Sequence, residues 1–470
     1  MSKDQAPFIP SSPDESPVPS ATWRVFGTKA YFRLWLAQVI SSTGDWIGLI
    51  AILAIAARVS NNSGAAVSLV MLARVIPGFF LATLGGVIID RFDRRLVMVF
   101  SDIGRAGLLI LLPFVDTLLA LVLISFCLEI FTLLWGPAKD ASVPNLVDTD
   151  QLQSANTLSL VASFGTFPIA AVIFSLLAAL AAWLGGFGSL HTLEVDQETL
   201  ALLFDAGSFL VSAAIVWSLP IPRGHADREK KLKLSETVRD IRDGLAYMAH
   251  EPRVRGVIVG LGVGLIGGGA MIPLGPVFAQ QGIGGDAATF GVLMSALGFG
   301  AAAGVISLLF VQNKLPREAV FEFAVMGTGI FLMIAATLSA LFPAALAAAF
   351  VGACAGTSYV TGFTVLQETT QDDMRGRIFA TLYTVIRMCL LVALVISPLW
   401  ADFWDWIVND LGNVGVVSIG AVSYAFPGVR IALWGGGLIT LGAGIYARWT
   451  MKHAARAEAD AAGVADDAAA

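Results

Sequence analysis

The sequence GGVIIDRFDRRLVM, residues 85–98, decides the fold of this chain. It lies between two long apolar runs and changes within a few residues from GGVII to the strongly polar DRFDRR. Arg91, Arg94 and Arg95 stand here beside Asp90 and Asp93. Apolar runs of about 20 residues that are joined by such short basic segments are typical of helices that cross a membrane.

The composition of the whole chain points the same way. Of its 470 residues, 56% are hydrophobic and 14% are charged, whereas soluble domains carry roughly 25% charged residues. A water-soluble fold is therefore not expected. The 48 glycines fit a membrane protein, because helices in lipid associate through close backbone contact at small residues.

Twelve apolar runs are long enough to span a bilayer, six before a polar interval and six after it. They are Tyr31–Ala57, Ala66–Ile89, Leu96–Leu118, Leu119–Ala138, Leu158–Leu184, Leu200–Leu219, Val254–Val277, Thr289–Val311, Ala319–Ala340, Phe342–Leu366, Ile378–Trp400 and Val429–Trp449. The sequence therefore predicts an all-α membrane protein with twelve transmembrane helices.

Lysine and arginine gather on one side of these runs. They follow the even-numbered runs as Arg91, Arg94, Arg95, Lys139, Lys314, Arg317, Arg375, Arg377, Arg448, Lys452 and Arg456, and eight more lie in the interval Pro220–Arg253. The opposite connections carry mainly Asp and Glu. Because cytosolic loops retain positive charge, we expect a multi-pass protein of the plasma membrane with both termini in the cytosol.

The runs and their polar intervals predict the domain organisation. Residues 1–30 form a disordered cytosolic tail rich in Pro and Ser, 31–219 a first six-helix bundle, 220–253 a linker, 254–449 a second bundle, and 450–470 a cytosolic tail. Val238, Ile241, Leu245 and Met248 give the linker an amphipathic helix, either on the membrane interface or in solvent. Within the second bundle, 401–428 is an extended external loop in which we expect a short interfacial helix, with a substrate lid as the alternative.

The opening stretch carries a recognisable motif. Gly86, Asp90, Arg91, Arg94 and Arg95 form a G-x-x-x-D-R-x-x-R-R arrangement that resembles the signature loop of the major facilitator superfamily. In that family the aspartate interacts with the N-terminal end of the eleventh helix and with nearby arginines, which holds the two halves closed on the cytosolic side. Asp93 departs from the family, which usually has glycine there. The alternative interpretation is a basic loop that only anchors topology.

Further stretches resemble the drug–proton antiporter branch, which includes macrolide-efflux-like and enterobactin-exporter-like proteins. They are FRLWLAQVISSTGDWIG (32–48), SDIGRAG (101–107), GPAKDASVPNLVDTDQLQSANTL (136–158), LFDAGSFLVSA (203–213) and DDMRGRIFAT (372–381). This resemblance implies two pseudo-symmetric six-helix bundles around a central cavity, a monomer, and export by alternating access.

Ionisable residues inside the runs are functional candidates, because each is costly at membrane depth unless it pairs or faces water. Glu129 and Asp45 are our candidates for proton coupling, with helix–helix hydrogen bonding as the alternative role. Arg74 and Arg387 could answer these acids or an anionic group of the substrate. Asp102 and Arg105 are three residues apart and predict a structural ion pair on one helix. We expect Asp205 to be interfacial.

These features predict a secondary transporter, in which protons drive the efflux of a lipophilic drug-like compound or metabolite across the lipid bilayer. The alternatives are a lipid or siderophore exporter of the same fold, and a scaffold or sensor that does not transport. An enzyme is not expected, because HExxH, GxSxG and Walker A patterns are missing from the sequence. No cofactor, metal site or nucleic-acid partner is predicted, and Cys127, Cys354 and Cys389 lack metal-binding spacing.

Overall fold

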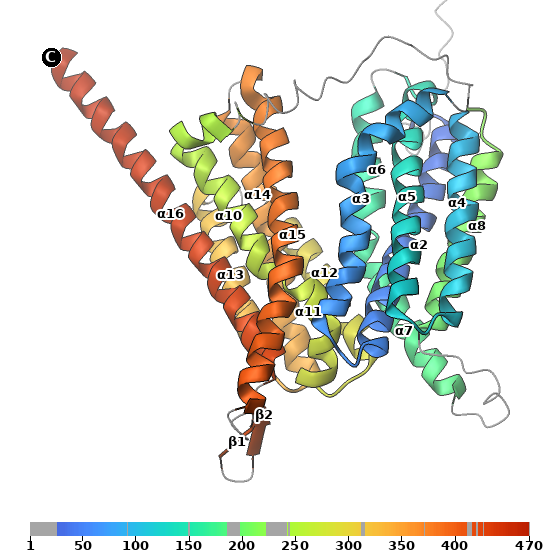
Figure 1. Ribbon diagram of the computed structural model, residues 1–470. Helices are drawn as coiled ribbons and strands as arrows, with labels where there is room; N and C mark the ends of the chain where they lie inside the picture. The colour runs from blue at the N-terminus through green and yellow to red at the C-terminus, as the bar shows by residue number, and fades with distance from the viewer. Residues whose placement is uncertain are drawn as a thin grey trace, which may run out of the picture.

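The computed structural model describes residues 26–91, 93–148, 151–185, 198–221, 242, 245–311, 315–370, 372–410, 416–419, 422–425 and 427–469. Almost all of them are helical (Figure 1). Eleven helical stretches among them are long and apolar enough to cross a membrane, and the described part of one further helix contributes the shorter apolar stretch Gly64–Gly78. The prediction of an all-α protein with twelve membrane helices is therefore confirmed.

The first half of the chain supplies six of these membrane passages. Its helices are α2 (Lys29–Val59), α3 (Gly64–Arg91), α4 (Arg94–Leu111), α5 (Leu118–Ser142), α6 (Leu152–Phe164), α7 (Phe167–Gly185) and α8 (Thr199–Trp217), with short 3₁₀ turns at Leu112–Phe114 and Val143–Asn145. Several begin with a capping side chain. Thr28 accepts the amide of Tyr31 at the start of α2, and Thr117 accepts the amide of Ala120 at the start of α5.

The second half supplies the other six. Its elements are α10 (Pro252–Gly268), α11 (Met271–Val277), a π-helical turn (Phe278–Gly282), α12 (Ala287–Val311), α13 (Arg317–Thr337), α14 (Leu341–Thr369), α15 (Asp372–Asp410), the strands β1 (Val416–Ile419) and β2 (Val422–Ala425), and α16 (Gly428–Ala469). Of the predicted linker helix, Leu245–His250 is helical, whereas Val238 and Ile241 lie outside the described residues.

Two predicted continuous spans are interrupted in the structure. The fifth is divided into α6 and α7 around Gly165 and Thr166, and the seventh into α10 and α11 around Gly269 and Ala270. In both cases a proline follows closely, Pro168 or Pro273. Proline has no backbone N–H to donate to the carbonyl four residues earlier, and its ring clashes with that carbonyl. Both breaks therefore lie where a proline removes one backbone hydrogen bond of the helix.

The external segment after the eleventh span differs from the expectation of a separate interfacial helix. α15 continues without a break through Trp400 to Asp410, and the chain then forms the antiparallel hairpin β1–β2, with Val416 opposite Ala425. The aromatic residues expected at headgroup level occupy the last turns of α15, where Trp400 and Phe403 stack at 5.6 Å. Because the helical spacing of this region continues that of the preceding span, no boundary separates the two.

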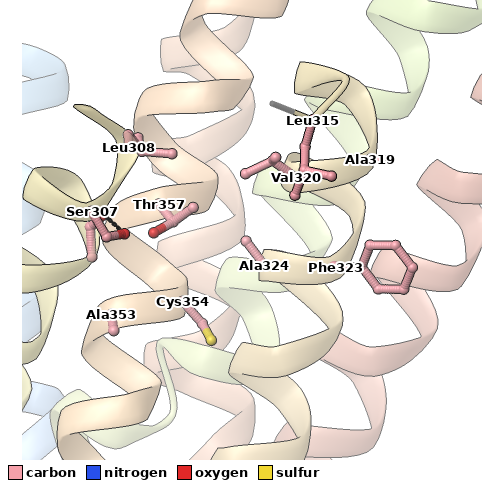
Figure 2. Close-up of a pocket in the computed structure, with 11 residues that line it drawn as sticks. Ser307, Leu308, Leu315, Ala319, Val320, Phe323, Ala324, Ala353, Cys354 and Thr357 are labelled. Atoms are coloured by element: carbon pink, nitrogen blue, oxygen red, sulfur yellow. Dashed lines mark hydrogen bonds between the residues drawn. The ribbon is translucent and has the colours of Figure 1, made fainter. Parts of the chain in front are cut away.

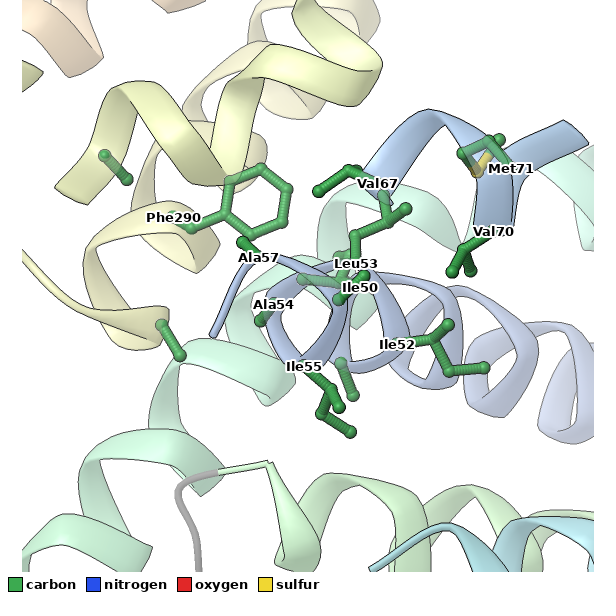
Figure 3. Packing of buried hydrophobic residues seen from close by; sticks show 14 of the residues in the cluster. Ile50, Ile52, Leu53, Ala54, Ile55, Ala57, Val67, Val70, Met71 and Phe290 are labelled. Atoms are coloured by element: carbon green, nitrogen blue, oxygen red, sulfur yellow. The ribbon is translucent and has the colours of Figure 1, made fainter. Parts of the chain in front are cut away.

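The two halves meet at one end and diverge toward the other (Figure 1). The largest hydrophobic cluster includes residues from both halves, and Figure 3 shows Phe290 of α12 facing Ala57 of α2 and Val67 of α3. α7 packs on α12, where the hydroxyl of Ser175 donates to the carbonyl of Ala288 at 3.0 Å. The two other clusters each lie within a single half. The halves are therefore joined where α2, α3 and α7 meet α11, α12 and α15.

Candidate functional site

Arg105 is the centre of a charge network inside the first half. Its Nη1 lies 3.2 Å from Oδ2 of Asp45 on α2, and its Nη2 donates to Oδ1 of Asp102 at 2.5 Å. Its guanidinium also lies 4.0 Å from the centre of the Phe209 ring on α8. Only 2% of the side chain is exposed. The charge is thus removed from solvent and compensated by two carboxylates and an aromatic face.

Asp102 is the fully buried member of this network. It lies one turn before Arg105 on α4, which brings the two predicted partners into direct contact. Its other oxygen, Oδ2, accepts from the hydroxyl of Ser212 at 2.8 Å and from the indole Nε1 of Trp135 at 3.3 Å. Both carboxylate oxygens therefore have partners, and the group ties α4 to α5 and α8.

Asp45 has the same cation as its partner but a different environment. It lies in the middle of α2, and 31% of its side chain is exposed. Among the described contacts, its carboxylate accepts from Arg105 across the gap between α2 and α4. Asp45 is therefore partly accessible from outside the bundle, whereas Asp102 is enclosed.

Glu129 and Arg74 complete the network from α5 and α3. Both side chains are half-buried. Arg74, Asp45 and Arg105 lie near enough to Glu129 to act on it electrostatically. Within the described part of the chain, neither Glu129 nor Arg74 forms an ion pair in direct contact. Glu129 thus has the guanidinium groups of Arg74 and Arg105 nearby, and among the described residues neither forms a direct ion pair with it.

Asp205 also belongs to this network, and the expectation that it is interfacial is wrong. It is buried on α8, where the hydroxyl of Ser208 donates to its carbonyl oxygen at 2.8 Å. α2 reaches it through Gly44 and Gly48, since a Cβ at either glycine would overlap the Asp205 carboxylate. The sequence signal was the small-xxx-small spacing of Gly44 and Gly48, which allows another helix to approach closely.

The network carries an excess of acid. Asp45, Asp102, Glu129 and Asp205 supply four carboxyl groups against the two guanidinium groups of Arg74 and Arg105. If all were ionised, two carboxylates would lack a matching positive charge inside a membrane helix bundle, which is energetically costly. The arrangement therefore favours the uptake of protons or of another cation.

The loop motif lies at the end where the halves diverge. Gly86, Asp90 and Arg91 belong to the last turns of α3, and their side chains lie outside the described residues. Arg94 donates to the carbonyl of Ala141 at the end of α5, at 2.7 Å, and Arg95 lies over the ring of Trp217 on α8 at 5.5 Å. Both described arginines thus contact helices of their own half.

Arg387 is not part of the charge network. It is a partly exposed side chain on α15, in the second half, and forms no ion pair among the described residues. One turn before it, the exposed Tyr383 belongs to an aromatic group with Phe363 and Tyr359 of α14, whose rings are 4.5–6.0 Å apart. The ionisable network of the first half and this aromatic group of the second therefore lie on different helices.

A family model described as "Transmembrane secretion effector" matches residues 20–394 of the chain. Among curated proteins, the uncharacterized MFS-type transporter YfiS of Bacillus subtilis is 29% identical, over 48% of this chain and about half (50%) of that protein's length. Macrolide efflux protein A of Streptococcus pyogenes is 22% identical over 79% of this chain and 89% of that protein. The residues that the family model matches include the whole charge network.

Solved structures show the same architecture. A bacterial homologue of the human lysosomal transporter Spinster, in an inward-facing and unoccupied conformation, aligns with a TM-score of 0.65 at 14% identity, over 90% of this chain and 96% of that one. The nucleoside transporter NupG aligns with a TM-score of 0.63 at 12% identity, over 90% of this chain and 100% of that one. At these identities the likeness establishes the fold of two helix bundles.

Proposed function

The chain belongs to the major facilitator superfamily, among its transmembrane secretion effectors, and from this we propose that it exports a lipophilic small molecule in exchange for protons. The family and fold make it a membrane transporter. The efflux direction is supported by the similarity to macrolide efflux protein A, whose match spans 79% of this chain. From the same similarity we propose that the substrate is a drug-like compound or metabolite.

The excess of carboxyl groups in the first half is the observation that supports proton coupling. A proton-coupled carrier needs a group that takes up a proton on one side of the membrane and releases it on the other. Asp45 is partly exposed and pairs with a cation, while Glu129 has no cation in direct contact among the described residues. None of the four histidines lies within a predicted span, which leaves carboxyl groups as the carriers in this proposal.

Arg105 would link the protonation of Asp45 to the packing of the helices. With Asp45 ionised, its guanidinium bridges α2 and α4. Protonation of Asp45 removes the charge that attracts Nη1, so that Arg105 pairs with Asp102 alone. The bridge between α2 and α4 then weakens, while Asp102 keeps its bonds to α5 and α8. Proton uptake would in this way change how α2 packs against the rest of its bundle.

The charge bias of the loops gives the proposal an orientation. We propose that the protein lies in the plasma membrane with both termini in the cytosol. We also propose that it acts as a monomer. The halves then diverge on the cytosolic side, where Asp90, Arg91 and Arg94 would help to close them when the transporter turns outward. Arg387 and Arg74 would serve as cation partners for the carriers or for anionic groups of the substrate.

Proton flux in proteoliposomes tests the proposal. Purified protein is reconstituted with a pH-sensitive dye inside, and lipophilic cations, macrolides and siderophores are added in turn. Wild type is expected to move protons when a transported compound is added. Glu129→Gln or Asp45→Asn, which removes the titrating group with little change in shape, is expected to abolish this flux and leave compound binding in place.

Asp116→Asn is the matched control, because Asp116 is an exposed carboxylate in the connection before α5. This variant should behave like wild type. If no compound elicits proton flux from wild type, the proton-coupled proposal fails. Compound transport without proton movement would instead point to a lipid-like substrate or to another form of uncoupled transport. The absence of both compound transport and proton flux would favour a scaffold or sensor.

A further inference from the structure

An apolar pocket opens in the second half, away from the charge network (Figure 2). It has a volume of about 380 Å³, which is near the lower end of the range for small-ligand sites. Three helices line it, with Gly304 and Leu308 from α12, Val320 and Phe323 from α13, and Ala353 and Cys354 from α14. The described lining contains no charged side chain.

The helix packing explains why this space exists. α14 lies against both α12 and α13. Its contact with α12 is made backbone to backbone, since a Cβ at Gly304 would overlap the main chain of Ala353. On its other side, Cys354 of α14 packs against Gly327 of α13. α12 and α13 therefore stand on either side of α14, and the small residue Ala353 forms the floor of the groove between them.

The surface around the pocket is a lipid-facing surface. Phe310 and Ile306 of α12 are 71% and 56% exposed, and Phe323 of α13 is 57% exposed. Exposed side chains of this kind on membrane helices are solvated by acyl chains rather than by water. The hydroxyl of Ser307 in the pocket already donates to the carbonyl of Gly304 at 2.6 Å. The pocket is thus an apolar recess in the lipid-facing surface of the protein.

We propose that this pocket binds an acyl chain of a bilayer phospholipid. An empty groove would lose the dispersion contacts of its lining, and phospholipid chains are the abundant apolar molecules at its mouth. The pocket lies where α12 ends and where α13 begins at Arg317. The loop charge bias assigns that end to the cytosol, so the chain comes from the cytosolic leaflet. The site is independent of proton coupling.

A photoreactive lipid tests the assignment. The full chain is reconstituted with phosphatidylcholine that carries a diazirine in one acyl chain, irradiated and digested, and the cross-linked peptides are mapped by mass spectrometry. Cross-links are expected to concentrate on the segments 304–308, 319–324 and 353–357. Unlabelled phospholipid dilutes the probe equally at every site, so the measured quantity is the density of cross-links at these segments relative to the rest of the lipid-facing surface. This ratio is expected to be several-fold above one, because a chain held in the pocket stays beside its lining.

Filling the pocket provides the decisive comparison. Ala353→Phe is expected to lower cross-linking at these segments by about tenfold, the loss expected when roughly two methylene groups are no longer buried. Ala319→Leu fills the same space from α13 and should act in the same direction. Ala303→Phe is the control, because it adds the same ring to an exposed position of α12 outside the described pocket lining.

Two results would overturn the assignment. One is uniform cross-linking along all lipid-facing helices that neither filling variant changes. The other is displacement of the photoreactive lipid from these segments, and not from the rest of the lipid-facing surface, by compounds that the protein transports, which would make the pocket part of the substrate path. The distribution of cross-links on the wild-type protein is measured without the variants, so a failure of Ala353→Phe to fold does not leave the proposal untested.

Discussion

The two halves share one architecture but hold their helices together by different means. In the first half, Arg105 joins α2 and α4 through two carboxylates, and Asp102 extends the network to α5 and α8. In the second half, α12 and α14 touch through their backbones, at positions where a Cβ on Gly300 or Gly352 would overlap a carbonyl of the other helix. The first half thus has a buried charge network at its centre, whereas the α12–α14 contact of the second is made by close packing. The ion pairs of the second half, Arg253–Glu318, Arg317–Glu368 and Arg448–Glu322, use arginines that are 27–39% exposed, against 2% for Arg105.

This difference indicates a division of labour. Ion pairs can be rearranged by a proton, because protonation of one carboxyl group changes which partners attract each other. Contacts between backbones have no comparable switch, since a packed helix pair is stiff and does not titrate. The buried network of the first half is therefore the part of the molecule on which the proposed proton coupling would act.

The largest expected effect comes from removing the central cation. Arg105→Met leaves Asp102 as a buried carboxylate without its cation, and such a loss typically costs about 3–5 kcal/mol of folding free energy. We expect a correspondingly lower midpoint in a chemical unfolding titration of the detergent-solubilised protein. The size of the change would measure how far the first half depends on this ion pair.

The double variant Arg105→Met with Asp102→Asn separates charge from shape. It removes the uncompensated carboxylate, so most of the lost stability should return, while proton-coupled transport should stay absent. If the double variant is no more stable than Arg105→Met alone, the cost lies in lost packing against Phe209 rather than in the unpaired charge.

The close packing of the second half can be broken by a single side chain. In Gly352→Val the new Cβ would meet the carbonyl of Leu297 on α12, and we expect a loss of about 3 kcal/mol or more, because backbone cannot move aside as a flexible side chain can. The measurement is the melting temperature and the monodisperse fraction of purified protein.

Gly207→Val in α8 is the matched control, since no atom lies within 4 Å of a Cβ built at Gly207. It should leave the melting temperature nearly unchanged. Equal losses in the two variants would mean that valine itself, rather than the α12–α14 contact, is the cause, and the contrast between the halves would then lose its basis in packing.

The sequence predicted the positions of the helices far better than it predicted which helices contact one another. Apolar runs of sufficient length defined the twelve spans, because each must satisfy its own backbone in lipid. The α6–α7 break needed recognition of Pro168 inside an otherwise uniform run. The prediction of a short helix after Trp400 placed helix in this segment but missed that it continues α15, because the apolar spacing extends to Asp410 without a signal for the end of the span.

Within the candidate site, the contact between residues of one helix could be predicted from their spacing, whereas the contacts between different helices could not be predicted. Asp102 and Arg105 are three residues apart, so their contact follows from helix geometry. The bond from Arg105 to Asp45 spans 60 residues of sequence, and which helices become neighbours is decided by packing of the whole bundle. Asp205 was misplaced for the same reason, because its burial depends on Gly44 and Gly48 of a distant helix.

The smallest expected effect concerns the start of α4. Asp93, where the family usually has glycine, caps this helix through a 3.0 Å bond from the Arg95 amide to its Oδ1. α13 in the second half begins after Pro316, which provides no side-chain cap bond. Asp93→Ala should cost about 1 kcal/mol, and amide hydrogen exchange at Arg95 should be roughly fivefold faster, with no change in the first turn of α13.

Asp93→Asn separates the two roles of this residue. Asparagine caps a helix about as well as aspartate, so exchange at Arg95 should stay slow in this variant. Unchanged exchange with altered transport would show that the extra negative charge acts on Asp90 and the arginines of the loop. Unchanged exchange and unchanged transport would mean that Asp93 stabilises α4 alone, and that the departure from glycine leaves the gate motif intact. Fast exchange in Asp93→Asn would contradict the assignment of Asp93 as the cap of α4. The contrast between the starts of α4 and α13 would then be lost.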